Sequence, residues 1–152
     1  MNSVILTAAT RLLTPLMVAF SLFILLRGHN EPGGGFIGGL IAATAFALYA
    51  KAMGVAATRQ ALRFAPEAIA VGGLGFATLA GLWGLVQEGA FLEGIWPLLT
   101  TAADGSKAGL PVGSVLLFDV GVYLVVVGSV LTILLALEED VIDVADRPAA
   151  ED

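Results

Sequence analysis

The sequence predicts an all-α membrane protein with four transmembrane helices, and three observations lead to this fold. Of the 152 residues, 58% are hydrophobic and 13% are charged, whereas a soluble domain has about 45–50% and about 25%. Residues 115–117 and 123–127 are apolar without interruption, whereas strands of a membrane barrel would alternate. Four windows reach the length of about 20 residues that crosses a bilayer: residues 4–26, 34–53, 68–86 and 112–137.

The first two spans follow each other closely in the chain. The first contains Arg11 and Pro15. It is too long, and its first cation comes too late, for a simple cleaved signal peptide, so we expect a retained helix. The short connection of residues 27–33 predicts a tight turn into the second span.

The third and fourth spans are reached through longer connections. Residues 54–66 form a cationic loop in which Arg59 and Arg63 are expected at lipid phosphates. Pro66 suits the first turn of the following helix. Before the fourth span, the mixed segment 87–111 carries apolar residues at helical spacing, which predicts an interfacial half-helix: Phe91, Leu92, Ile95, Trp96 and Leu99.

The acidic charge of the chain is concentrated at its C-terminal end. The formal net charge is −6, and residues 138–152 carry all of it, because residues 1–137 are neutral. We therefore expect a four-helix transmembrane domain, residues 1–137, and a solvated acidic tail, residues 138–152, whose first third can instead continue the fourth helix. This distribution excludes a basic nucleic-acid-binding surface. The lack of Cys excludes disulfides and thiol-ligated metal.

The cations predict the orientation of the chain in the membrane. With four spans, both termini lie on one side. Five basic residues lie on the side of the termini and the middle loop: Arg11, Lys51, Arg59, Arg63 and Arg147. Two lie on the other side: Arg27 and Lys107. Since basic residues are retained on the inner side, we expect cytoplasmic termini.

The most informative segment is the glycine-rich stretch of residues 28–40, Gly-His-Asn-Glu-Pro-Gly-Gly-Gly-Phe-Ile-Gly-Gly-Leu. A phosphate-binding loop requires Lys and then Ser or Thr after its last Gly, and Leu40 stands there instead. The alternative is a turn followed by a helix with two overlapping GxxxG pairs, Gly34/Gly38 and Gly35/Gly39. A similar stripe occurs in the third span: Gly73, Ala77 and Gly81. We expect these stripes to contact helices of other subunits.

Three segments together resemble one known family. They are Arg-Leu-Leu-x-Pro at 11–15, the stretch 28–40, and Phe-Asp-x-Gly-Val-Tyr-Leu-x-Val-x-Gly at 118–128. In order and spacing they resemble the B subunit of Mrp-type (Mnh) multisubunit sodium/proton antiporters. The positions with turn or helix-packing roles are Pro32, Gly33, Gly34, Gly35, Phe36, Gly38, Gly39, Gly121 and Gly128.

The resemblance implies a small subunit of a complex in the bacterial plasma membrane. Such a complex exchanges cytoplasmic Na⁺ for external H⁺. Its partners would be hydrophobic subunits of the A, C, D, E, F and G types, together with membrane lipid. A scaffold subunit of a hydrogenase-like respiratory complex is an alternative, because related subunits occur there. A homo-oligomeric channel is a third possibility.

Three ionisable residues are candidates for an ion path. Asp119 lies inside the fourth span, where a charge is costly and therefore functional or specifically stabilised. It is either a relay for a cation or proton or a carboxylate at a helix N-terminus. His29, which titrates near neutral pH, and Glu31 are candidates for proton exchange at the outer surface, or polar turn residues.

Arg11 and Glu67 are candidates for a structural ion pair, since both fall on the cytoplasmic side of their predicted spans. Alternatively, Arg11 extends to the headgroups. We expect no enzyme activity, cofactor or metal site, because no nucleophile with an activating base and no set of three or four ligands occurs. One intramembrane carboxylate and no internal repeat are too little for an independent exchanger.

Overall fold

A computed structural model describes residues 4–28, 33–97, 99–101, 107–109 and 112–145. It contains four long helices: α1 (Val4–Arg27), α2 (Gly35–Met53), α4 (Pro66–Glu88) and α5 (Ser114–Ala145). Its shorter elements are α3 (Val55–Leu62), β1 (Leu99–Thr101) and β2 (Lys107–Gly109). The four long helices are long and apolar enough to cross a membrane, which confirms the predicted class of a helical, multi-pass membrane protein.

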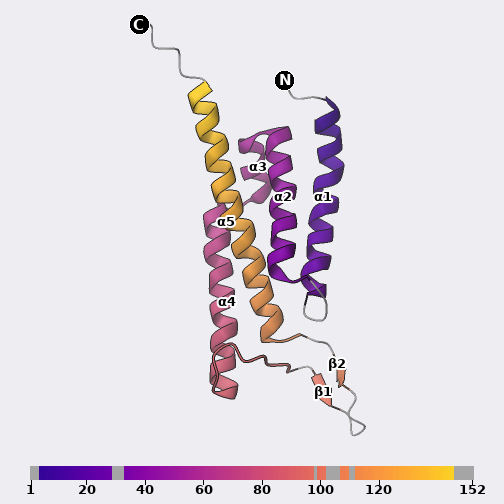
Figure 1. Cartoon of the computed structure of the whole chain (residues 1–152), viewed down its shortest axis with the longest axis vertical. Helices are drawn as coiled ribbons and strands as arrows, with labels where there is room; N and C mark the ends of the chain where they lie inside the picture. Colours follow the sequence, from indigo (N-terminus) through magenta and orange to yellow (C-terminus); the bar gives the residue numbers. More distant parts are fainter. Residues whose placement is uncertain (1–3, 29–32, 98, 102–106, 110–111, 146–152) are drawn as a thin grey trace.

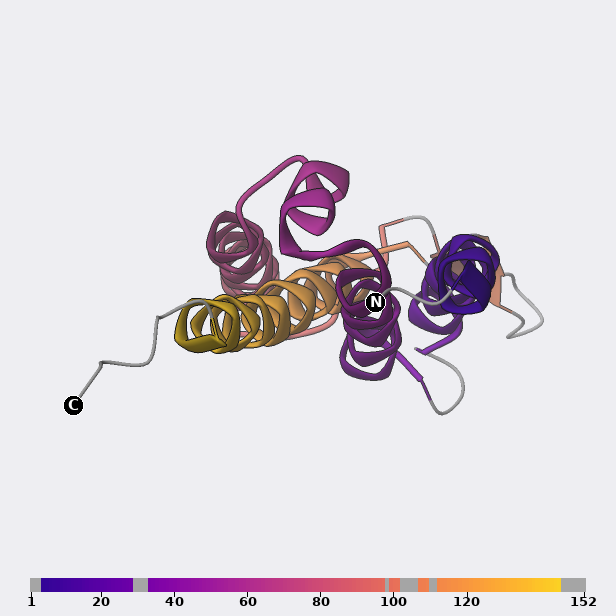
Figure 2. The same ribbon diagram turned by 90° about the horizontal axis from the view of Figure 1, so that it is seen from above.

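The long helices form an open row and not a closed four-helix bundle. The order across the row is α1, α2, α5, α4, and each helix packs mainly against its neighbour in that order (Figures 1 and 2). The core is thin and lies along α2 and α5, where Ala42 and Ala43 pack against Val127 and Leu131. Large apolar side chains face outward from every long helix, which fits lipid or neighbouring subunits in a membrane.

The turn between α1 and α2 depends on a glycine with unusual backbone angles. Gly34 precedes α2 with φ 89° and ψ −170°, a conformation that side-chain-bearing residues rarely adopt. Its N–H donates to the carbonyl of Ile24 on α1 at 3.2 Å. This hydrogen bond brings the start of α2 close to the end of α1. Residues 29–32 of the predicted turn, including Pro32, lie outside the described residues.

The glycines of the two predicted stripes, on α2 and α4, pack within this chain, which corrects the expectation that the stripes contact other subunits. A Cβ on Gly35 would overlap the backbone carbonyl of Asp119 on α5, and a Cβ on Gly39 would lie 2.9 Å from the Tyr123 carbonyl. Gly38 is equally close to α1, 2.8 Å from the Ser21 carbonyl. The stripes allow the backbones of α1, α2 and α5 to approach closely, and they are no evidence for an external partner helix.

Helices α4 and α5 approach each other through glycines on both sides of the contact. A Cβ on Gly73 would lie 2.6 Å from the carbonyl oxygen of Gly121, and one on Gly121 would lie 2.6 Å from the N atom of Ala77. Further along, Gly128 packs against the backbone of Ala70 and Pro66. Antiparallel packing with backbones in contact therefore extends over much of α4.

The prediction of an interfacial half-helix around residues 91–99 is wrong, because residues 91–97 and 99, which the structure describes, are not helical. Helix α4 ends at the left-handed Gly89, and Leu92 also has a positive φ of 66°. The chain then folds back, with the Leu92 N–H donating to the carbonyl of Gly81. A two-stranded antiparallel hairpin follows, in which Leu99 pairs with Gly109. Two positive φ values within four residues exclude a continuous helix, whatever the apolar spacing.

One other connection differs from the prediction. Residues 55–62 form the helix α3 instead of a loop, with Val55 and Thr58 buried. Helix α5 continues past residue 137 to Ala145, which is the alternative in which the first part of the acidic segment continues the fourth helix. Hydropathy predicts where a helix leaves lipid, but it gives no information on how far the helix continues in water.

We predict that Gly73→Ala destabilises the protein, whereas Gly75→Ala on the same helix does not. The added methyl at Gly73 meets backbone atoms of α5, which cannot move aside by a side-chain rotation. At Gly75 the added methyl meets nothing within 4 Å. Overpacking of this kind costs about 1–3 kcal/mol. Thermal unfolding of the detergent-solubilised protein measures the difference. Equal midpoints for the two variants would show that α4 and α5 do not pack in this way.

Candidate functional site

Asp119 lies where α5 passes the start of α2. It is the sixth residue of α5, about 7 Å from the first residue at 1.5 Å per residue, and it is half-buried. Its carboxylate is next to Gly34, because a Cβ on Gly34 would lie 3.4 Å from Asp119 Oδ1. The position is too far along α5 to cap that helix. The carboxylate instead lies at the N-terminus of α2.

The electrostatic surroundings of Asp119 have two components. The first N–H groups of α2 donate no hydrogen bond to a capping side chain, since the N-cap residue is Gly34, and a helix N-terminus carries a partial positive charge that favours a nearby carboxylate. Among the residues that the structure describes, no hydrogen bond or ion pair engages the Asp119 side chain. The carboxylate is therefore placed favourably and keeps its oxygens available.

A row of hydroxyl groups lies between α1 and its neighbours. It consists of Thr10, Thr14 and Ser21 of α1 and Tyr123 of α5, which we call the hydroxyl seam. Ser21 Oγ and the Tyr123 hydroxyl are 2.9 Å apart, joining α1 to α5 one turn beyond Asp119. Thr14 Oγ1 reaches the carbonyl of Ala45 on α2 at 3.5 Å. These contacts place polar groups inside the helix row, where lipid offers them no alternative partner.

Thr10 is the exception in the hydroxyl seam. Its side chain is fully buried, and its Oγ1 has no hydrogen-bond partner in the described part of the chain. A buried hydroxyl without a partner costs about 1–3 kcal/mol, so this position is either strained or satisfied by something outside the chain. Thr10, Thr14 and Ser21 are separated by four and seven residues, a spacing that places them on one face of the helix. The mean hydropathy of a span does not reveal this spacing.

The other residues predicted from the sequence are not described at this site. His29 and Glu31 lie outside the described residues, between Gly28 and Gly33. Arg11 and Glu67 are both exposed, on α1 and α4. Because α2 and α5 lie between these helices (Figures 1 and 2), no ion pair joins the two residues in the described structure.

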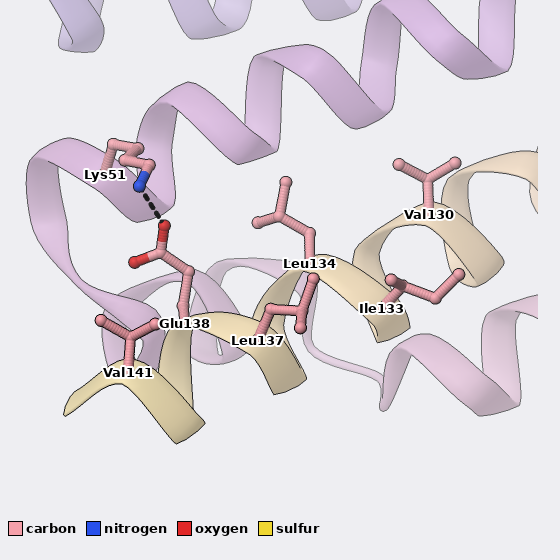
Figure 3. A pocket seen from close by; sticks show the side chains of 7 residues that line it. All are labelled: Lys51, Val130, Ile133, Leu134, Leu137, Glu138 and Val141. Carbon is pink, nitrogen blue, oxygen red and sulfur yellow. Dashed lines mark ion pairs between the residues drawn. The ribbon is translucent and has the colours of Figure 1, made fainter. Parts of the chain in front are cut away.

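Two ion pairs that the sequence does not predict connect α5 with the α2–α3 region. Lys51 Nζ on α2 lies 2.5 Å from Glu138 Oε1 (Figure 3). Arg59 on α3 donates two hydrogen bonds, of 3.0 and 3.2 Å, to the carboxylate of Glu139. From the sequence, the cations are expected as separate lipid anchors and the acids as part of a solvated tail. The helical continuation of α5 brings them together.

A metal-binding cluster is not part of the described structure: no group of three or more His, Cys, Asp and Glu comes together within the described ranges. The arrangement around Asp119 offers one carboxylate, a helix N-terminus and a pair of hydroxyls. These groups can exchange a proton or contact a small cation in transit. They contain neither an activated nucleophile nor a base beside it.

The chain matches a family model described as a domain related to the MnhB subunit of Na⁺/H⁺ antiporter, over residues 5–132. It is 35% identical to the B subunit of the Na⁺/H⁺ antiporter of Alkalihalophilus pseudofirmus, over 91% of this chain and 94% of that protein. The corresponding antiporter subunit of Bacillus subtilis is 36% identical, with 91% and 95% covered.

The fold is also similar to part of a solved structure, that of the Mrp complex from Dietzia sp. DQ12-45-1b. The TM-score is 0.74 at 34% identity, and the match covers 95% of this chain and 15% of the chain in that structure. The family model covers most of the chain, and the two antiporter relatives are matched over nearly their whole length. The chain therefore belongs to the MnhB-related family of antiporter subunits.

Proposed function

We propose that this chain is the B-type component of a multisubunit secondary transporter that exchanges cytoplasmic Na⁺ for external H⁺ across a bacterial plasma membrane. Support comes from its relatives, which are named as B subunits of Na⁺/H⁺ antiporters and are matched over almost their full length. The chain itself carries little intramembrane charge. It therefore works together with other hydrophobic subunits and not as an independent carrier.

The open row of helices supports a role in assembly. Large apolar side chains of α1, α4 and α5 are exposed. Since the glycines are already used inside the chain, neighbouring subunits are expected to pack against these larger side chains. This role favours the antiporter over a homo-oligomeric channel, because the glycine stripes pack inside the chain and do not offer a surface for self-association. The relatives' names favour it over a hydrogenase-like scaffold.

The orientation in the membrane follows from the cations. The start of α1, the ends of α2 and α5, and helix α3 all lie at the same end of the long helices, at the top of Figure 1. Lys51, Arg59 and Arg63 belong to this end of the molecule. Acidic residues count little in the positive-inside rule, so the ion pairs with α5 do not change the assignment. We place this end, and with it both termini, in the cytoplasm.

The observation that carries a transport role is the available carboxylate of Asp119 beside Gly34. A carboxylate inside a span is costly and is retained where it serves a path or a partner. Asp119 lies near the outer end of α5, and the hydroxyl seam extends from its neighbour Tyr123 to Thr10 on the cytoplasmic side. The two features together form a polar line along most of the span, which we propose as part of the ion path.

We predict that Asp119→Asn leaves the complex assembled and lowers Na⁺-driven proton exchange at least about tenfold, because an amide has the same shape but cannot release a proton. Exchange is measured in vesicles containing the purified complex, and assembly is measured by its size in mild detergent. The matched control is Glu67→Gln, which neutralises an exposed carboxylate without an ion pair in the described structure. Normal exchange by Asp119→Asn would leave only a structural role at the start of α2.

We predict that Thr10→Val lowers exchange while the thermal stability is unchanged or higher. Valine has nearly the same shape, and it removes the buried hydroxyl that lacks a partner. A purely structural Thr10 would give higher stability with normal exchange, which would remove Thr10 from the path. Thr44→Val is the control, because Thr44 is exposed and its hydroxyl bonds to the Leu40 carbonyl of its own helix at 2.8 Å.

A further inference from the structure

A groove of about 540 Å³ lies between the end of α2 and the outward face of α5. Its lining is almost entirely apolar, with the Lys51–Glu138 ion pair as its polar part (Figure 3). The apolar lining residues come from α5: Val130, Ile133, Leu134, Leu137 and Val141. Their spacing of three and four residues forms one continuous stripe along the helix.

We propose that this groove binds one membrane phospholipid with a zwitterionic, amine-bearing headgroup. The proposal is independent of ion exchange and uses only the placement of the chain in a membrane. The acyl chain would lie along the α5 stripe, and the headgroup would lie over the ion pair. The following observations favour a lipid over a helix of another subunit.

The depth of the groove matches one leaflet. From Glu138 to Val130 the stripe extends about 12 Å along α5 at 1.5 Å per residue. Half of the hydrocarbon core is about 15 Å thick. The polar end of the groove coincides with the first charged residues after the apolar part of α5. A lipid in the leaflet on this side has the same order, with a charged head at the surface and an apolar chain below it.

The ion pair is complementary to a zwitterionic headgroup. Lys51 has three N–H donors, and its side chain is 68% exposed although Glu138 Oε1 occupies one of them. The remaining donors can bind phosphate oxygens. Glu138 is 23% exposed and can accept from the headgroup ammonium. A helix of another subunit would need opposite charges at this one height, whereas the headgroup supplies both.

The experiment measures bound lipid in the complete complex. Purified complex in mild detergent is incubated with phosphatidylethanolamine, and the retained lipid is counted by native mass spectrometry. Lys51→Gln should reduce the retained phosphatidylethanolamine about fivefold, the upper range for the loss of one exposed ion pair. Leu137→Trp, which fills the groove and keeps the ion pair, should reduce it similarly.

Arg59→Gln is the matched control, because it removes the second ion pair to α5 but does not line the groove. Lipid retention in this variant should equal that of the unmodified complex, and the size of every complex should be unchanged. Equal retention in Lys51→Gln and the unmodified complex would overturn the proposal. So would the loss of a neighbouring subunit from Lys51→Gln and Leu137→Trp but not from Arg59→Gln, because the groove would then be a protein interface.

Discussion

Backbone-to-backbone contact along α5 is the constraint on which the rest of this structure depends. Helices in lipid gain little from hydrophobic burial, so close packing of small residues holds them together. Helix α5 meets α2 at Gly35 and Gly39 and meets α4 at Gly73 and Gly121. These contacts give α5 two neighbours on different sides, and they produce a row in which it is a central element. The same contacts bring the Asp119 carboxylate to the start of α2.

Hydrogen bonds and ion pairs between helices add to the close contacts that the glycines allow. The Ser21–Tyr123 hydrogen bond connects α1 with α5 across the start of α2, although these two helices have little other contact. At the opposite end, Lys51 and Arg59 bind consecutive acids of α5. Interhelical hydrogen bonds in membranes are worth about 1 kcal/mol each, less than close packing along a whole helix. Their main contribution here is to set the rotation and register of α5, and the register determines which residues share the interior.

The four spans could be predicted from the sequence, because hydropathy and length respond to the bilayer alone. The partner of each glycine could not be predicted, since a GxxxG pattern indicates close approach but not the helix that approaches. The prediction of a half-helix at 91–99 was wrong because Leu92 adopts a positive φ, which apolar spacing does not reveal. Asp119 could be identified as a candidate from its cost in lipid, but its neighbour Gly34 depends on tertiary packing. Thr10 could not be identified as a candidate from the sequence, because a threonine barely lowers the hydropathy of a span.

The two ion pairs have a mechanical consequence for the opposite membrane face. From Glu138 back to Asp119 is nineteen residues of uninterrupted helix, about 28 Å. A continuous helix is stiff, so anchoring its C-terminal end to α2 and α3 through the two ion pairs also restricts the rotation of Asp119 about the helix axis at the other end. High salt, which screens the two surface ion pairs, would then widen the range of orientations of the Asp119 carboxylate. This would happen although no salt ion approaches Asp119 itself.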